Sequence, residues 1–214
     1  MARCGTRQGG EEGAVHRLSV GGSAVSIAVG QQPHALVIDT ALDRAYVAVA
    51  WSDEVVAVDL QTRVTVGRQL VGALTESVAL SPDGARVAVA AADANMVTLL
   101  DAETLAVEAR VEVPGRPVCA TFTGRMLFVS LGNAASLAAI DPATETVEAV
   151  IAVGQLPDGT VVEPSGRYDY IANADSQTIS VVDLGRLEVV AELPTEVGMS
   201  GLIWRTAPIV ALRS

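Results

Sequence analysis

Lysine is absent from this 214-residue sequence, and aromatic side chains make up only 3% of it. The 14 basic residues are therefore all arginines, and 25 acidic residues give a formal charge of −11. An acidic surface repels phosphate backbones, so nucleic-acid partners are excluded and the charge is interpreted as a solubility feature. No apolar run reaches the roughly 18 residues that span a bilayer, so the abundant Val, Ala and Leu indicate a packed core.

Cysteine is scarce, and Cys4 and Cys119 have neither CxxC nor metal-ligand spacing. Catalytic signatures are missing as well: there is no GxSxG, HExxH, P-loop, Rossmann or CxxCH haem motif. The N-terminus lacks the apolar core of a secretory signal. These absences favour a cytoplasmic protein without an enzymatic site. A periplasmic or secreted location is the alternative if the N-terminus is truncated.

What the sequence does contain is an internal repeat. Aspartates 59, 101, 141 and 183 lie 42, 40 and 42 residues apart. They close the segments AYVAVAWSDEVVAVD (45–59), RVAVAAADANMVTLLD (86–101), MLFVSLGNAASLAAID (126–141) and YDYIANADSQTISVVD (168–183). A period near 40 residues with several short strands is typical of a propeller blade. The sequence therefore predicts an all-β protein, a β-propeller of four-stranded antiparallel blades.

Turn residues recur in phase with these aspartates. A glycine follows each predicted outer strand, and turn signals such as Ser81-Pro82-Asp83-Gly84 open the second strands. Aspartate at a strand end accepts hydrogen bonds from the amides of the next turn. The four repeat aspartates are therefore predicted to hold turns rather than a metal ion.

The repeat also predicts the domain layout. Residues 1–13 are polar and glycine-rich, which predicts a disordered lead-in before a single propeller domain at 14–214. Complete blades are expected at 31–72, 73–115, 116–154 and 155–198. The remaining segments 14–30 and 199–214 resemble two outer and two inner strands, so they are predicted to form a composite fifth blade that closes the ring. A closed ring predicts a monomer. The alternative is a piece of a longer propeller, such as one of seven blades, which would need another chain.

The fourth segment resembles the repeat of the YVTN-type β-propellers. Tyr170-Ile171-Ala172-Asn173 stands at the position of the YVTN motif, and Val181-Val182-Asp183 stands at the end of the unit. The resemblance covers about residues 14 to 213, although the other three units depart from the motif. It implies the propeller fold. The relatives of that family include surface-layer proteins, lactonases and the propellers of haem-containing nitrite reductases, so the resemblance does not choose one activity.

Candidate site residues follow from the blade-end glycines. Counting from these glycines places His34, Glu76 and Asp158 at equivalent positions on the face where propeller ligands sit, with Arg116 beside them. An imidazole and two carboxylates can hold a divalent cation or act as acid and base. These four residues are the candidate ligand-binding set, and no catalytic residue is assigned. A divalent cation is the only cofactor that they suggest, and solvated rim polarity is the competing interpretation.

Two functions of different classes follow. The leading hypothesis is a non-enzymatic module that presents loops to a protein or small-molecule ligand. The alternative is a lactonase-like or metal-assisted hydrolase, or its remnant, with a site at the channel mouth. A third hypothesis, a redox cofactor domain like that of the nitrite reductases, predicts visible absorbance.

Overall fold

The computed structural model describes residues 15–20, 23–199 and 202. The regular structure in this part of the chain is almost entirely β-strand. Its helices are two short 3₁₀ turns, η1 (Ala50–Ser52) and η2 (Gly132–Ala134). No helix in the described ranges is long and apolar enough to cross a membrane. Four antiparallel sheets of four strands each follow a two-stranded hairpin, and the predicted fold class is confirmed.

Each sheet is one blade, and its strands lie in chain order. The hairpin contains β1 (Val15–Val20) and β2 (Ser23–Ala28). Blade 1 contains β3 (Pro33–Asp39), β4 (Arg44–Val49), β5 (Glu54–Asp59) and β6 (Val64–Leu70). Blade 2 contains β7 (Thr75–Leu80), β8 (Arg86–Ala91), β9 (Met96–Asp101) and β10 (Val107–Glu112). Blade 3 contains β11 (Pro117–Thr123), β12 (Met126–Leu131), β13 (Ser136–Asp141) and β14 (Thr146–Ala152). Blade 4 contains β15 (Pro157–Val162), β16 (Tyr168–Asn173), β17 (Thr178–Asp183) and β18 (Glu188–Pro194).

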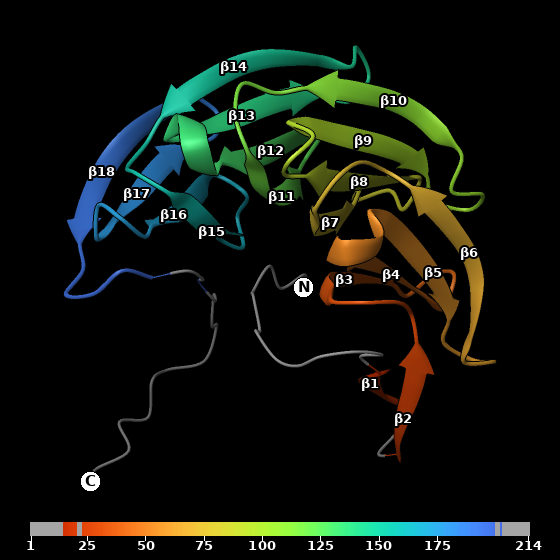
Figure 1. Cartoon of the computed structure of the whole chain (residues 1–214). Helices are drawn as coiled ribbons and strands as arrows, with labels where there is room; N and C mark the ends of the chain where they lie inside the picture. The colour runs from red at the N-terminus through yellow and green to blue at the C-terminus, as the bar shows by residue number, and fades with distance from the viewer. Residues whose placement is uncertain (1–14, 21–22, 200–201, 203–214) are drawn as a thin grey trace, which may run out of the picture.

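The blades stand side by side in an arc (Figure 1). Their first strands, β3, β7, β11 and β15, are neighbours on the inner side of the arc, and their fourth strands form the outer side. The predicted closing partner of the hairpin, residues 201–213, lies outside the described residues except Leu202, as does the predicted lead-in at 1–13. The composite fifth blade therefore stays a prediction.

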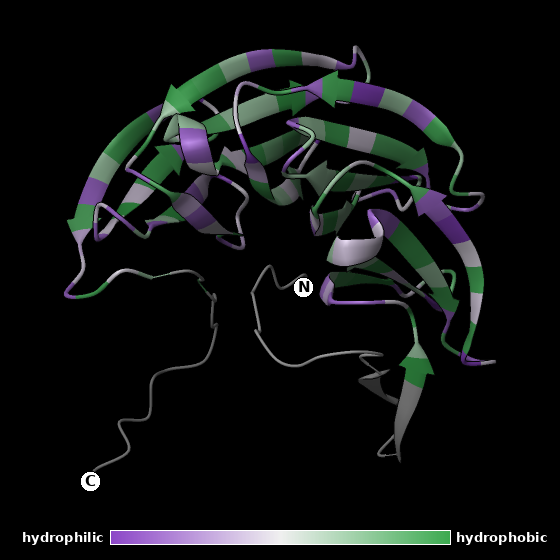
Figure 2. Cartoon of the chain, viewed as in Figure 1, coloured by the Kyte–Doolittle hydropathy of each residue, from purple (hydrophilic) through white to green (hydrophobic). Residues whose placement is uncertain are grey.

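The hydrophobic core consists of layers between consecutive blades. One apolar cluster joins blades 1 and 2, another joins blades 2 and 3, and a third joins blades 3 and 4. The middle strands are buried on both faces. In β6, exposed residues alternate with partly buried ones, and β14 follows the same pattern except that Ile151 is buried. Figure 2 shows the same contrast as green middle strands and banded outer strands. The run of Val and Ala suits this packing because both faces of a middle strand need compact side chains.

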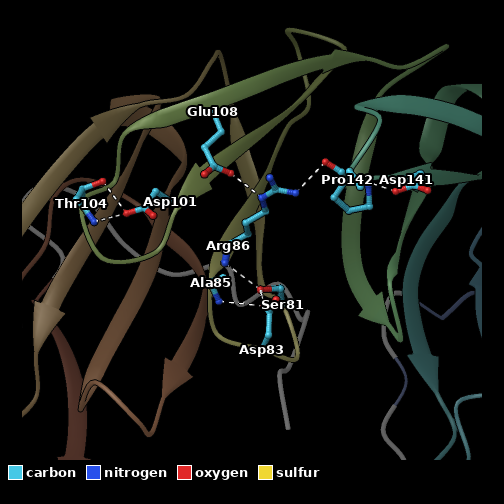
Figure 3. A network of polar contacts seen from close by, with 10 residues as sticks. Ser81, Asp83, Ala85, Arg86, Asp101, Thr104, Glu108, Asp141 and Pro142 are labelled. Carbon is cyan, nitrogen blue, oxygen red and sulfur yellow. Dashed lines mark hydrogen bonds and ion pairs between the residues drawn. The ribbon is translucent and has the colours of Figure 1, made fainter.

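Polar side chains at the start of the second strands connect one blade to the next. In blade 1, the Tyr46 hydroxyl donates to the Ala102 carbonyl at 2.6 Å, and Arg44 Nη1 donates to the Glu103 carbonyl at 2.7 Å. In blade 2, Arg86 Nε donates to Glu108 at 2.6 Å and Nη1 donates to the Pro142 carbonyl of blade 3 at 2.9 Å (Figure 3). These bonds fix the spacing of the blades, and thereby the position of their inner strands.

The structural role predicted for the four repeat aspartates is confirmed. Asp59 Oδ1 accepts hydrogen bonds from the amides of Gln61 and Thr62, and Asp101 Oδ1 accepts one from Thr104. Asp141 and Asp183 accept from the corresponding turn amides. These hydrogen bonds hold the pKa of Asp59 and Asp101 below the usual aspartate range, so both carboxylates stay ionised in the turns.

Candidate functional site

A β-bulge at the start of an inner strand presents each of three candidate side chains. The pairing of β3 with β4 shifts between Pro33 and Ala35, which leaves His34 out of register. The same shift leaves Glu76 out of register in β7 and Asp158 out of register in β15. A bulge aims one side chain away from the regular pleat, and bulges are frequent beside functional sites. Three blades therefore use one backbone device to project a polar residue.

Blade 3 carries the same irregularity with different chemistry. Its register shifts between Pro117 and Ala120, so the residues in the bulge are Val118 and Cys119, both buried. The polar side chain from this blade is instead Arg116, which directly precedes β11. The loop before it is one residue shorter than the corresponding loops of blades 1, 2 and 4. The Arg116 guanidinium therefore comes from the residue before the strand, whereas the carboxylates of Glu76 and Asp158 come from the bulges.

The loops that deliver these residues are held by hydrogen bonds of their backbone groups. In blade 2 the Leu74 amide donates to Asp53 Oδ1 at 2.9 Å, and the Leu74 carbonyl accepts from the Ala92 amide at 2.8 Å. Gly72 has φ +128°, and a Cβ there would lie 2.9 Å from the Ala91 Cβ. Only glycine fits this close approach without strain. The loop before Glu76 is thus fixed from both sides.

His34 is oriented by the backbone of the neighbouring blade. Its Nδ1 lies 2.6 Å from the Glu76 carbonyl oxygen. A carbonyl only accepts hydrogen bonds, so Nδ1 carries the proton in the neutral imidazole and Nε2 is left as an acceptor. Nε2 lies 3.8 Å from Glu76 Oε2. Protonation of His34 would therefore add an ion pair to the same carboxylate.

Glu76 and Arg116 form the centre of the site. Arg116 Nη2 donates to Glu76 Oε1 in an ion pair between blades 2 and 3. The Glu76 side chain is 10% exposed, and that of Arg116 is 30% exposed. Since a nearly buried carboxylate is costly without a counter-charge, the guanidinium compensates Glu76 while part of it still faces solvent.

Asp158 completes the group from blade 4. Burial raises the pKa of its carboxyl above the usual aspartate value, and the charges of Arg116 and His34 act in the opposite direction. Both of these opposing residues belong to the candidate set. The structure thus brings His34, Glu76 and Arg116 into contact, and Asp158 lies near enough for the charges of Arg116 and His34 to act on its pKa.

The arrangement offers hydrogen-bond donors and acceptors within one small area. Arg116 supplies donors, and His34 Nε2 supplies an acceptor in its neutral form. Asp158 supplies a carboxyl whose raised pKa lets it keep its proton to higher pH than a solvated aspartate does. Among the described residues, no three His, Cys, Asp or Glu side chains lie close enough together to hold a metal ion. The set is suited to hydrogen bonding with a polar ligand group.

Sequence reasoning did not single out one buried polar residue, Asp169 in β16. Asp169 pairs across the strands with Val162. In blade 1 the same register position is held by Ala45, which pairs with Ile38. Blades 2 and 3 place Val87 and Leu127 at the same register position. A comparison of the four repeats position by position contains this signal, because only the fourth unit has a carboxyl among apolar residues.

The chain is similar to solved β-propeller structures. It matches hydrazine synthase of Kuenenia stuttgartiensis at 19% identity and a TM-score of 0.71, over 82% of this chain and 52% of that chain. It matches the β-propeller domain of Cps50 (Swd1) of Myceliophteria thermophila at 16% identity and 0.69, over 82% and 60%. It matches the dihydro-heme d1 dehydrogenase NirN, in complex with DHE, at 20% identity and 0.69, over 80% and 39%. No family model and no curated protein matches the sequence.

These matches define the class of protein as a β-propeller. All three identities are low, so they show the fold and leave the YVTN family as a resemblance of the sequence alone. The chain spans between 39% and 60% of the length of these three solved chains. The comparisons therefore support a β-propeller architecture.

Removing the arginine of the central ion pair is expected to destabilise the fold. Arg116→Met would leave the Glu76 carboxylate nearly buried without its guanidinium, at a cost of about 2 kcal/mol of unfolding free energy. We would measure it by urea denaturation at pH 7.5. Arg186→Met is the matched control, because Arg186 and Glu188 are 66% and 49% exposed and such pairs contribute about 0 to 1 kcal/mol. Equal losses in both variants would show that the Glu76 pair is an ordinary surface contact.

Proposed function

We propose that this chain is a binding module that holds a peptide segment or a small polar ligand at the channel mouth through His34, Glu76, Arg116 and Asp158. The observation that supports the proposal is the convergence of one polar side chain from each of four blades, three of them aimed by equivalent bulges. Strands carry His34, Glu76 and Asp158, and Arg116 directly precedes a strand, so the ligand meets a preorganised site.

A peptide amide is the ligand group that suits this set. Its carbonyl can accept from Arg116, and its N–H can donate to His34 Nε2 or to the Asp158 carboxylate. Neutral amides also avoid the repulsion that an anion would meet from a protein of charge −11. The same charge favours peptides with basic flanking residues, because complementary charge raises the association rate at low salt.

The proposal is tested by selecting peptides from a random display library on the wild-type chain and measuring each by fluorescence anisotropy. We expect selected peptides to bind the wild type at least tenfold more tightly than the Glu76→Gln/Arg116→Met variant, which removes both charges of the ion pair together. Basic peptides should lose affinity between 50 and 200 mM salt. Equal affinity for wild type and variant would place the binding surface elsewhere and overturn the proposal.

A hydrolase of the metal-assisted kind makes a different prediction at the same residues. Calorimetric titration with Ca²⁺, Mg²⁺ and Zn²⁺ compares the wild type with Glu76→Ala/Asp158→Ala. Stoichiometric heat that is lost in the variant would favour that alternative over a peptide-binding module. Negligible heat in both proteins is the result that we expect, because Glu76 is already paired with Arg116. Binding heat that persists in the Glu76→Ala/Asp158→Ala variant would come from a metal site elsewhere in the protein.

A further inference from the structure

A cavity lies along the inner strands at the end opposite to the channel-mouth residues. Its volume is about 360 Å³, and all four blades contribute to its wall. The cavity is lined mainly by the later residues of β3, β7, β11 and β15, whereas His34, Glu76 and Asp158 lie near the starts of their strands. Its wall includes Ile38, Leu80, Thr121, Phe122, Thr160 and Val162. The side chains that line the cavity are thus apolar apart from two threonine hydroxyls, and backbone groups of the inner strands supply further polar atoms.

One of these hydroxyls is bonded to a buried carboxyl. Thr160 Oγ1 lies 2.8 Å from Asp169 Oδ1 and 3.0 Å from Oδ2. Asp169 is fully buried, with 0% of its surface exposed. The pKa of Asp169 is raised by burial, and hydrogen bonds from Thr160 and from the backbone amides of Tyr170 and Val161 oppose this rise. This carboxyl therefore gains hydrogen bonds but little of the compensation that an arginine would provide.

The other blades show that the fold does not require a carboxyl here. Ala45, Val87 and Leu127 hold the same register position, and each is completely buried. Their partners across the strands are Ile38, Leu80 and Phe122, which also line the cavity. Asp169 lowers the stability of the fold at a position that apolar residues fill in the other three blades. A buried charged group of this kind indicates a function, because departures from apolar core packing occur mostly at functional sites.

The carboxyl changes what Thr160 offers to the cavity. A threonine hydroxyl has one proton and two lone pairs. Because that proton is directed to the Asp169 carboxylate, the oxygen can act toward the cavity only as an acceptor. The negative charge behind it also strengthens the acceptor through cooperative polarisation. Among the side chains that line the cavity, Thr160 therefore contributes a fixed acceptor from blade 4.

We propose that this cavity binds a compact, mostly apolar molecule with one hydrogen-bond donor, which donates to Thr160 Oγ1. Asp169 acts as a positioning residue, because it contacts Thr160 and not the ligand. The cavity volume lies in the range of small-molecule sites, about 300 to 1,000 Å³, and admits a single substituted ring. This inference is independent of the channel-mouth function, since the two sites use different residues at opposite ends of the strands.

The test compares p-cresol with toluene, which have the same methylated ring and differ in the hydroxyl donor. Binding to the full chain at pH 8 is measured by ligand-observed NMR and calorimetry. Burial of apolar surface alone would favour toluene, the less polar probe. We expect p-cresol to bind about tenfold more tightly, which is the factor that one hydrogen bond in an apolar site supplies.

Four variants distinguish hydrogen bonding to Thr160 Oγ1 from apolar packing as the cause of the preference for p-cresol. Thr160→Val keeps the shape and removes the hydroxyl, so the preference for p-cresol should disappear. Thr160→Ser keeps the hydroxyl and should keep the preference, which guards against a folding defect in the valine variant. Thr121→Val is the control on the same wall, and the preference should survive it. Asp169→Leu should reduce the preference while the chain stays folded, because blade 3 carries leucine at this position.

Three outcomes would overturn the inference. The first is that neither probe binds up to its solubility limit. The second is that toluene binds as tightly as p-cresol. The third is a preference for p-cresol that survives Thr160→Val in a folded protein. None of these bears on peptide binding at the channel mouth, which is tested by the Glu76 and Arg116 variants.

Discussion

Asp169→Asn should make the protein more stable at pH 8 by about 3 kcal/mol. Burial raises the pKa of this carboxyl from 3.8 to about 7, a gap that corresponds to about 4 kcal/mol of unfolding free energy. Asparagine is nearly the same shape and carries no charge, so that cost is removed. About 1 kcal/mol is deducted for a buried amide whose hydrogen bonds are not all satisfied.

The pH dependence gives the same prediction a second observable. In the unfolded chain Asp169 loses its proton near pH 4, whereas in the folded chain it keeps the proton until about pH 7. The folded state therefore binds more protons between these values, and its stability falls as the pH rises from about 4 to about 7. Above pH 7 this contribution is constant. The asparagine variant lacks the slope, so its advantage should be largest at pH 8 and absent at pH 4, where only the cost of the buried amide, about 1 kcal/mol, remains.

Urea denaturation of both proteins from pH 4 to pH 8 measures this difference directly. Taking the difference cancels the carboxylates that stabilise in the opposite sense, such as Asp59 and Asp101, whose pKa values are lowered by turn hydrogen bonds. Asp93→Asn is the control for loss of one negative charge, because residue 93 is exposed. A pH-independent difference between wild type and Asp169→Asn would mean that Asp169 does not titrate as its burial implies.

Deletion of residues 201–214 should convert a monomer into oligomers or aggregates. The prediction rests on the proposed composite blade, in which this segment and residues 14–30 close the ring. Blade 4 is the last blade in the described part of the chain, and the face that it turns away from blade 3 includes Tyr170, Ile179 and Leu193. The equivalent ring positions in blades 1 and 3, Tyr46 and Phe128, are 0% and 2% exposed, because a following blade covers them.

An uncovered Val-rich sheet face invites association with other copies. Size-exclusion chromatography with light scattering measures the oligomeric state of the full and the shortened chain, and thermal unfolding measures their stability. Deletion of residues 1–13, the predicted lead-in, is the matched control and should leave both unchanged. A 1–200 chain that stays monomeric and as stable as the full chain would contradict the composite blade. Full-length chains that already associate would favour the alternative, a piece of a larger propeller.

Local chemistry explains why the fold was predictable. The turn aspartates, such as Asp59 and Asp101, bond to amides within three residues of themselves, so their role can be inferred from neighbours in the sequence. The alternation of small apolar residues marks the strands in the same way. The candidate site was predicted in part. Counting from the blade-end glycines placed His34, Glu76 and Asp158 in equivalent positions, because one repeat period carries the same backbone path.

The geometry of the site depended on contacts that the count could not supply. The tautomer of His34 is set by a carbonyl 42 residues away, and the charge of Glu76 is compensated by Arg116, 40 residues away. Asp169 was missed for a related reason. Its neighbours in the strand suggest an ordinary exposed aspartate, and only the packing of blade 4 against blade 3 makes it a buried one.

The sequence by itself determined the blade period, the strand and turn order and the positions of the polar residues along each repeat, because all of these follow from interactions within a few residues or from recurrence. The tertiary structure decided which side chains meet. Equivalent bulges present His34, Glu76 and Asp158 at the starts of their strands. The packing of the blades then leaves Glu76 paired with Arg116, Asp158 half-buried and Asp169 fully buried. Charge and burial act across space, so these properties exist only once the blades are packed side by side.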